Sequence, residues 1–147
     1  MKIKNDLNMS FPALSANESF ARGAVAAFVS RLDPTIEEVN DIKTAVSEAV
    51  TNCIVHAYGQ TAGTVYIYCE ILKNNTVKIR IKDRGCGIED IEQAMQPLYS
   101  SLGGERAGLG FAVMQSFSDA LKVSSKPGRG TSVTIIKKIM PRYPSNG

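Results

Sequence analysis

The segment SEAVTNCIVHAY, from Ser47 to Tyr58, has the pattern of an amphipathic helix with a polar row along its edge. Apolar residues recur at the three- and four-residue spacing of one helix face, at Ile42, Ala45, Val46, Ala49, Val50, Cys53 and Ala57. Glu48, Asn52 and His56 follow one another at intervals of four residues, so they lie in a row beside this stripe. Taken alone, such a row is usually the solvated side of a helix.

Length and composition indicate one ordinary globular domain spanning residues 1–147. The chain is 44% hydrophobic and 21% charged, and a domain of this size buries roughly two-thirds of its unfolded surface. A net charge of +3 without a basic cluster gives no argument for nucleic acid or a membrane surface as a partner. No signal peptide and no apolar run of the ~18 residues that a membrane span needs are found, so we expect a cytoplasmic protein.

The cysteines fit neither a disulfide framework nor a zinc site. Cys53, Cys69 and Cys86 are odd in number and lie in separate predicted elements, and the chain has one histidine. We therefore expect reduced thiols.

The order of predicted elements indicates an α+β fold. A strand at residues 5–11 precedes a first helix, which runs from Ser15 to about Leu32 and opens with a capping box of Ser15 and Glu18. The second helix, capped by Asp33 or Thr35, ends by residue 59. Residues 63–83 form one hairpin and residues 121–139 a second hairpin around KPGRG.

Between the hairpins, the sequence predicts a short helix after the glycine turn at residues 84–87, a loop at residues 97–110, and helical spacing from Gly108. Helices grouped between hairpins predict a two-layer sandwich, with one mixed, mostly antiparallel sheet covered by helices on one face. The tail at residues 141–147 is expected to be disordered.

Asp83 lies in the first of three glycine-rich stretches, KDRGCGI, at the end of a predicted strand. Gly85 and Gly87 would let a ligand approach the backbone closely. An ionised Asp83 only accepts hydrogen bonds, which suits an exocyclic amine of a base. The plain alternative is a strand-ending turn whose aspartate caps the next helix.

The other two glycine-rich stretches are less specific. GGERAGLGF, residues 103–111, precedes a predicted helix, so its free N–H groups would suit phosphates and Arg106 would add charge. A flexible surface loop is the plain alternative. In PGRGTSV, residues 127–133, the glycines predict first a hairpin turn and Thr131 an ordinary strand residue.

The polar row of the second helix offers two catalytic groups. Asn52 has a neutral oxygen, which Mg²⁺ accepts as a ligand beside phosphate oxygens and waters. Glu48, one turn earlier, could take a proton from an attacking hydroxyl or water. His56 lies closest to the apolar stripe, so we expect it to pack or to make a structural hydrogen bond.

Together and in this order, these stretches resemble the four ATP-binding boxes of the GHKL superfamily, which includes gyrase-type ATPases, heat-shock chaperones, histidine kinases and mismatch-repair proteins. The boxes are Glu48–Asn52, Asp83–Gly87, Arg106–Gly110 and Gly128–Thr131, within a resemblance that extends from about Ser10 to Lys138. The resemblance implies a Bergerat-type ATP-binding fold with ATP and Mg²⁺ as cofactors.

The resemblance also implies a role for each matching residue. Asn52 would ligate Mg²⁺, Glu48 would be the general base, and Arg106 would approach the γ-phosphate. Asp83 would bind the adenine amino group, and Thr131 would support the adenine through water. The remaining nucleotide contacts would come from Gly85, Gly87, Gly108, Leu109 and Gly110.

Three segments, NESFARGAVAAFVSRLDPT, DIKTAVSEAVTNCIVHAY and a lid of QPLYSS followed by ERAGLGFAVMQSFSD, resemble the small bacterial serine kinases that act as anti-sigma factors in endospore formers. This narrower resemblance implies two partners, a sporulation sigma factor and an anti-anti-sigma protein that is phosphorylated on serine, and a homodimer. On the first helix, Arg22 is expected to pair with a partner carboxylate, although a lone arginine on a helix is usually a solvated charge. The apolar face expected beside it comprises Phe20, Ala24, Ala27 and Phe28.

Other functions use the same boxes. A sensor histidine kinase needs a phosphoacceptor histidine on an upstream helical hairpin, for which the segment before Ser15 is too short. A plain ATPase would use Glu48 to activate water, but no transducer domain is evident. An ATP-dependent binding module would sequester a partner without phosphotransfer, and Glu48 favours the enzyme because a binding module needs no base.

Overall fold

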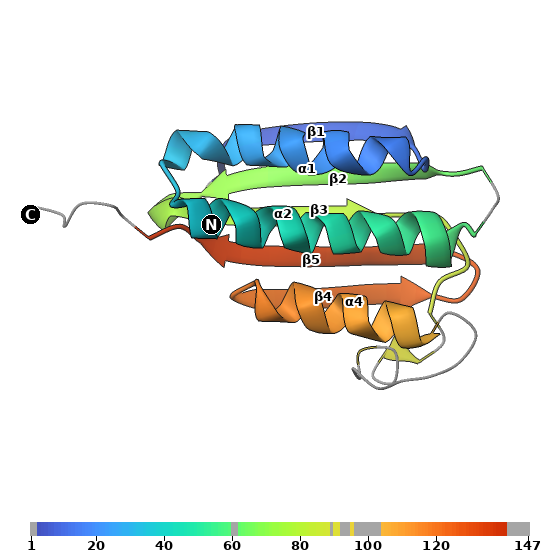
Figure 1. The fold of residues 1–147 in the computed structure, drawn as a ribbon. Coiled ribbons are helices and arrows are strands. Elements are labelled where there is room, and N and C mark those ends of the chain that lie inside the picture. The colour runs from blue at the N-terminus through green and yellow to red at the C-terminus, as the bar shows by residue number, and fades with distance from the viewer. Residues whose placement is uncertain (1–2, 60–61, 89, 92–94, 96–103, 141–147) are drawn as a thin grey trace, which may run out of the picture.

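The computed structural model describes residues 3–59, 62–88, 90–91, 95 and 104–140. Over these residues the chain forms a five-stranded sheet with strand order β1-β2-β3-β5-β4, and helices α1, α2 and α4 cover one face of it (Figure 1). All four strand pairings are antiparallel. The predicted α+β sandwich is thus confirmed, and the sheet is antiparallel throughout rather than mixed.

The regular elements follow the predicted order. The strands are β1 Ile3–Pro12, β2 Thr64–Leu72, β3 Thr76–Lys82, β4 Ala120–Lys126 and β5 Gly130–Lys138. The helices are α1 Ala16–Val29, α2 Ile36–Thr51 and α4 Gly104–Ser116, with short helical turns η1 Ser30–Leu32, η2 Asn52–Ala57 and η3 Lys73–Asn75. The β2–β3 hairpin turns where Asn74 and Asn75 adopt positive φ, a conformation that asparagine tolerates better than most residues.

Alternation along the strands separates a buried face from an open face. Along β2, Val65, Ile67 and Cys69 are fully buried against the helices. Their neighbours Tyr66 and Tyr68 face the other side, where Arg80 of β3 stacks 4.6 Å from the Tyr68 ring. The open face is therefore polar, while the helix face forms the core.

Helix α2 is the central helix of the layer and confirms the predicted stripe. Six of the seven predicted stripe residues are buried, namely Ile42, Ala45, Val46, Ala49, Val50 and Cys53. Thr35 caps this helix, because its Oγ1 accepts from the N–H of Glu38 at 3.1 Å and the Glu38 side chain accepts from the N–H of Thr35 at 2.9 Å. The choice between Asp33 and Thr35 is thereby resolved.

The expected capping box at Ser15 is wrong. Ser15 has helical dihedral angles and its side chain makes no capping bond, because a capping side chain needs the extended backbone that Thr35 has. Glu18 instead accepts from Thr51 of α2 at 3.2 Å and pairs with Arg22 at 3.4 Å. Its carboxylate therefore joins α1 to the end of α2.

The packing face of α1 also differs from the expected one. Ala21, Val25 and Val29 are buried, whereas Phe20 is 60% exposed. The fully buried face is offset by one residue from the expected face, and of the expected residues Phe28 is partly buried against the core.

Helix α4 begins at Gly104, four residues before the predicted start at Gly108. The loop expected through residue 110 is therefore wrong over its last seven residues. Glu, Arg and Ala are good helix formers, and each glycine costs only about 1 kcal/mol relative to alanine inside a helix. The predicted short helix near residues 88–96 and the tail at 141–147 lie mostly or wholly outside the described residues. Within the described ranges, no helix is both long and apolar enough to cross a membrane.

Candidate functional site

Helix α2 changes period at Asn52. Residues Asn52–Ala57 form a π-helical turn, a rare geometry that often occurs at functional sites. Within this turn Cys53 and Ile54 are buried, and Val55 is 51% exposed. His56 lies within this turn, and the four-residue row predicted from α-helical geometry therefore holds only from Glu48 to Asn52.

The side-chain amide of Asn52 is buried and unpaired. Neither its Oδ1 nor its Nδ2 has a hydrogen-bond partner in the structure. A buried polar group normally finds a partner, because an unpaired group costs about 1–3 kcal/mol. The amide therefore has hydrogen-bonding and ligating capacity that the fold itself does not use.

Gly110 of α4 covers this amide. A Cβ atom added at Gly110 would lie 3.1 Å from Asn52 Oδ1 and 3.2 Å from Glu48 Oε2. The two polar groups of the first predicted box thus face the backbone of α4 side by side. A carbonyl oxygen next to a carboxylate is a donor set that fits Mg²⁺, which commonly uses one or two protein ligands together with phosphate oxygens.

Asp83 follows directly after β3 and is the buried charged residue of the described core, with 4% exposure. Its Oδ1 accepts from the N–H of Gly85 at 2.9 Å and from the N–H of Thr131 at 3.2 Å. Burial raises the pKa of Asp83 above its ordinary value, and hydrogen bonds from Gly85, Cys53 and Thr131 offset part of this rise. The carboxylate is therefore fixed in position by its neighbours.

Cys53 connects the two predicted boxes. It follows Asn52 in the chain, and its thiol hydrogen-bonds to the Asp83 carboxylate. Burial, with the nearby Asp83 charge, raises the pKa of the Cys53 thiol well above its usual range, so the thiol stays protonated and acts as the donor. All three cysteines are free, as predicted, and Cys86 is exposed.

The glycines after Asp83 allow close backbone packing. A Cβ at Gly85 would collide with the carbonyl of Ala57, and the N–H of Cys86 donates to that same carbonyl at 3.0 Å. Gly87 has a φ of +77° and lies against the carbonyl of Lys126. The loop is thus held between the π-helical turn and the β4–β5 turn.

Tyr58 also fixes this loop. Its hydroxyl accepts from the N–H of Arg84 at 2.7 Å and donates to the carbonyl of Thr64 at 2.6 Å. The ring lies against Gly63, where a Cβ would collide with it. The residue next to Asp83 is therefore tied both to the end of the central helix and to the start of β2.

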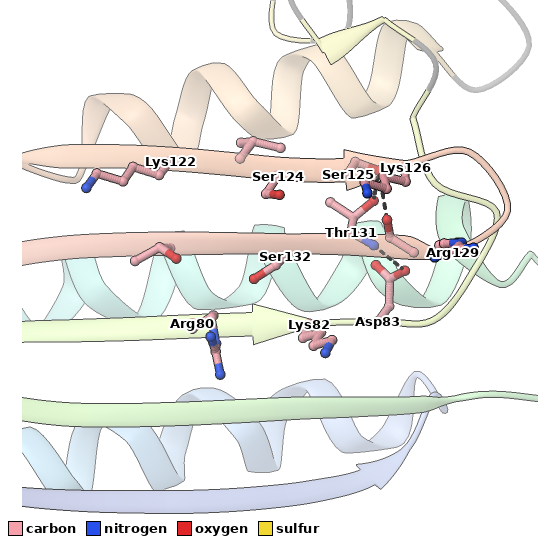
Figure 2. Close-up of a pocket in the computed structure, with 13 residues that line it drawn as sticks. Arg80, Lys82, Asp83, Lys122, Ser124, Ser125, Lys126, Arg129, Thr131 and Ser132 are labelled. Carbon is pink, nitrogen blue, oxygen red and sulfur yellow. Dashed lines mark hydrogen bonds between the residues drawn. The ribbon is translucent and has the colours of Figure 1, made fainter.

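Thr131 lies beside Asp83, because β3 and β5 are neighbouring strands (Figure 2). Its backbone exchanges hydrogen bonds with Asp83, from Asp83 N–H to Thr131 O at 2.9 Å and from Thr131 N–H to Asp83 O at 3.3 Å. Its hydroxyl lies 2.8 Å from Ser125 Oγ of β4. Sequence reasoning missed Ser125, whose position opposite Thr131 follows only from the register of the hairpin.

Figure 2 shows a concavity along β3, β5 and β4, which is lined mostly by residues of the open face of the sheet. Asp83, Ser125 and Thr131 lie at its end. The basic residues that line it are Arg80, Lys82, Lys122, Lys126 and Arg129. Their charges favour an anionic ligand nearby. Glu48 and Asn52 are not part of this lining, because they lie in the helix layer beneath Gly110.

The predicted site residues therefore form two adjoining groups. Glu48, Asn52 and Gly110 make one, and Asp83, Gly85, Gly87 and Thr131 make the other. Gly108, Leu109 and Arg106 lie in α4, and their side chains fall outside what the structure describes. Because the helix starts at Gly104, the N–H groups of Gly108 and Gly110 fall inside it rather than at its free end. Arg22 lies apart on α1, paired with Glu18.

This fold and these two groups define a histidine kinase-like ATPase domain, whose family model matches residues 11–137. Solved structures share the fold: a Mycobacterium tuberculosis protein with RsbU and RsbW domains has a TM-score of 0.68 at 16% identity, with 92% of this chain and 33% of that chain covered. The mycobacterial sensor histidine kinase MprB has a TM-score of 0.56 at 17% identity, with 91% and 100% covered.

Within this class the chain belongs to the anti-sigma F factor family. An anti-sigma F factor from Caldanaerobacter subterraneus is 56% identical, with 95% of this chain and 97% of the relative covered. Those from Pasteuria penetrans and Clostridium acetobutylicum are 51% and 50% identical; 92% of this chain is covered in each case, with 92% and 95% of the relatives.

Proposed function

We propose that this protein is an anti-sigma factor and an ATP-dependent protein-serine kinase, which binds a sporulation sigma factor and phosphorylates a serine of an anti-anti-sigma protein. The observation that carries the kinase proposal is the buried, unpaired amide of Asn52 beside Glu48. An amide kept unpaired at a cost of about 1–3 kcal/mol is explained by a ligand that occupies it. Membership of the anti-sigma F factor family supports the choice of partners.

In the proposed complex, different residues of the chain contact different parts of the nucleotide. Asp83 and Thr131 hold the adenine, with Gly85 and Gly87 allowing its close approach. Asn52 ligates Mg²⁺, which when bound would neutralise charge on the phosphates. The segment Arg106–Gly110 would approach the phosphates and supply the Arg106 charge.

Glu48 takes the proton in the transfer step. The substrate serine Oγ attacks the γ-phosphorus, and the bond between that phosphorus and the β–γ bridging oxygen breaks. ADP leaves with the bridging oxygen and its electron pair, while Glu48 accepts the proton of the serine hydroxyl. The products are phosphoserine and ADP.

The partner contacts are proposed to include Arg22. Its side chain is 42% exposed and its pairing with Glu18 is a partly buried contact between residues four apart. Helix pairs at this spacing contribute only a few tenths of a kcal/mol. A partner carboxylate can therefore replace Glu18 at small cost. We further propose that the protein acts in the cytoplasm as a homodimer, as the family resemblance implies.

Incubation with γ-labelled ATP, Mg²⁺ and a candidate anti-anti-sigma protein tests the kinase proposal. We expect label on a serine of that protein, and loss of the label with Asn52→Ala. Partner binding that depends on ATP but produces no phosphoserine would support the alternative, a binding module. Label released only as inorganic phosphate would indicate a plain ATPase.

A further inference from the structure

Ser125 lies at the centre of a hydrogen-bond network that joins three parts of the adenine half of the site. Its Oγ accepts from the N–H of Ile88 at 2.8 Å, in the segment after Gly87, and donates to the carbonyl of Gly130 at 2.9 Å. The same oxygen lies 2.8 Å from Thr131 Oγ1. Figure 2 shows Ser125 and Thr131 side by side on neighbouring strands, with Asp83 next to Thr131.

With all three bonds of Ser125 Oγ formed, the number of protons in this network fixes its direction. A serine hydroxyl has one proton and two lone pairs. The proton of Ser125 is given to the carbonyl of Gly130, and one lone pair receives the N–H of Ile88. One lone pair is left for Thr131, so Thr131 is the donor in the bond between the two hydroxyls. With its proton used in this way, Thr131 Oγ1 offers only lone pairs to a ligand.

Asp83 offers acceptors at the same place. Its Oδ1 lies 3.2 Å from the Thr131 nitrogen, and an ionised carboxylate has no proton to give. The two groups therefore present acceptors to a bound base. A base with N–H groups at this edge can satisfy them, whereas a carbonyl oxygen at the same edge would leave three acceptors facing one another.

We propose that Ser125 is a positioning residue that determines base specificity, because it holds the Thr131 hydroxyl as an acceptor and so favours a 6-amino purine over a 6-oxo purine. This inference rests on the proposed ATP site. A water molecule between Thr131 and the base would give the same preference for a 6-amino purine. When that water donates one proton to Thr131 and the other to Asp83, only its lone pairs face the base.

The test compares the binding of ATP with that of inosine triphosphate, both with Mg²⁺, by calorimetry. Wild type is expected to bind ATP more tightly. In Ser125→Ala the Thr131 proton is released and can turn toward a 6-oxo group, so the ratio of the two dissociation constants is expected to fall by about tenfold. Ser125→Thr keeps a hydroxyl and is expected to restore most of the ratio.

Ser124→Ala is the matched control, since Ser124 is the preceding residue of β4 and faces the opposite side of the sheet. It is expected to keep the wild-type ratio. If the role of Ser125 were purely structural, Ser125→Ala would weaken the binding of ATP and of inosine triphosphate alike. An unchanged ratio of the two dissociation constants in folded Ser125→Ala would therefore overturn the inference. If that variant does not fold, Thr131→Val, which removes the acceptor itself, must lower the ratio, and an unchanged ratio there overturns the inference equally. A wild-type protein that binds neither nucleotide would instead refute the proposed function.

Discussion

Replacing Asn52 by leucine should make the free protein more stable while abolishing its binding of MgATP. Leucine has nearly the shape of asparagine, and it removes a donor and an acceptor that are buried without partners. Each such group costs about 1–3 kcal/mol, so taking the lower value for each gives a gain of about 2 kcal/mol in the free energy of unfolding. For a chain of this length, that gain corresponds to a rise in Tm of about 4–8 °C.

Two measurements on the same variant check this reasoning. Thermal unfolding without nucleotide gives the change in Tm, and calorimetry with MgATP gives the affinity. Asn40→Leu is the control, because Asn40 is an exposed asparagine on the same helix and its replacement should change stability by no more than about 0.5 kcal/mol. Wild type should also gain about 2.7 kcal/mol when MgATP is present at a hundred times its Kd, and Asn52→Leu should gain nothing.

An Asn52→Leu variant that melts at or below the wild-type temperature would refute the link between the unpaired amide and a ligand. In that case the amide has a partner in solution that stabilises the fold, and its unpaired state cannot point to a ligand. If Asn52→Leu kept wild-type affinity for MgATP, Asn52 would not be a ligand of the metal, whatever the melting temperature.

Three further predictions concern catalysis, base recognition and partner binding. Glu48→Gln should keep ATP binding and slow phosphotransfer by about 10²–10⁴-fold, and single turnover within about twofold of wild type would exclude Glu48 as the base. Burial raises the pKa of Asp83, so its contribution to stability is largest below its ordinary pKa and is lost as the pH rises through the raised value. ATP binding needs the ionised carboxylate, so the affinity for ATP should fall as the pH drops through the raised pKa. Asp83→Asn should weaken ATP binding by about 30-fold and remove this pH dependence. A pH profile of ATP affinity that is the same in Asp83→Asn as in wild type would show that another group causes the pH dependence. Arg22→Glu should weaken partner binding more than Arg22→Ala and leave MgATP affinity unchanged, with Arg31→Ala as the control in pull-downs; wild-type binding by both Arg22 variants would leave α1 as scaffold.

The parts of the fold that were predictable from sequence are those set by local periodicity. The stripe from Ile42 to Cys53 and the two hairpins each repeat a period over several residues, so their burial follows from the pattern. The strand order and the uniformly antiparallel pairing depend on contacts between distant segments. The sequence therefore predicted a mixed, mostly antiparallel sheet. The predicted cap at Ser15 was wrong because the residue types at Ser15 and at Thr35 both fit a helix cap. The two positions differ in their backbone angles, which are helical at Ser15 and extended at Thr35.

The site divides in the same way. Asp83 became a candidate from its place after a strand, whereas a role for Thr131 came only from the family resemblance, and the structure brings the backbones of the two residues into contact. The π-helical turn at Asn52 could not be predicted, because nothing in its composition distinguishes it from a further α-helical turn. Ser125 and Tyr58 were missed because each acts through partners that are distant in sequence, at Ile88 and Arg84.

In the proposed complex, the position of Gly110 over Asn52 and Glu48 would make nucleotide affinity a property of two states. A cation ligated by Asn52 would need space beside the amide, where a Cβ at Gly110 would already lie within 3.2 Å of Asn52 Oδ1 and Glu48 Oε2, so binding would require an arrangement in which Gly110 has moved away. The apparent Kd is then the intrinsic value divided by the fraction of molecules in that open arrangement. Any partner that prefers the open arrangement raises the affinity for ATP without touching it, and bound ATP raises the affinity for that partner by the same factor.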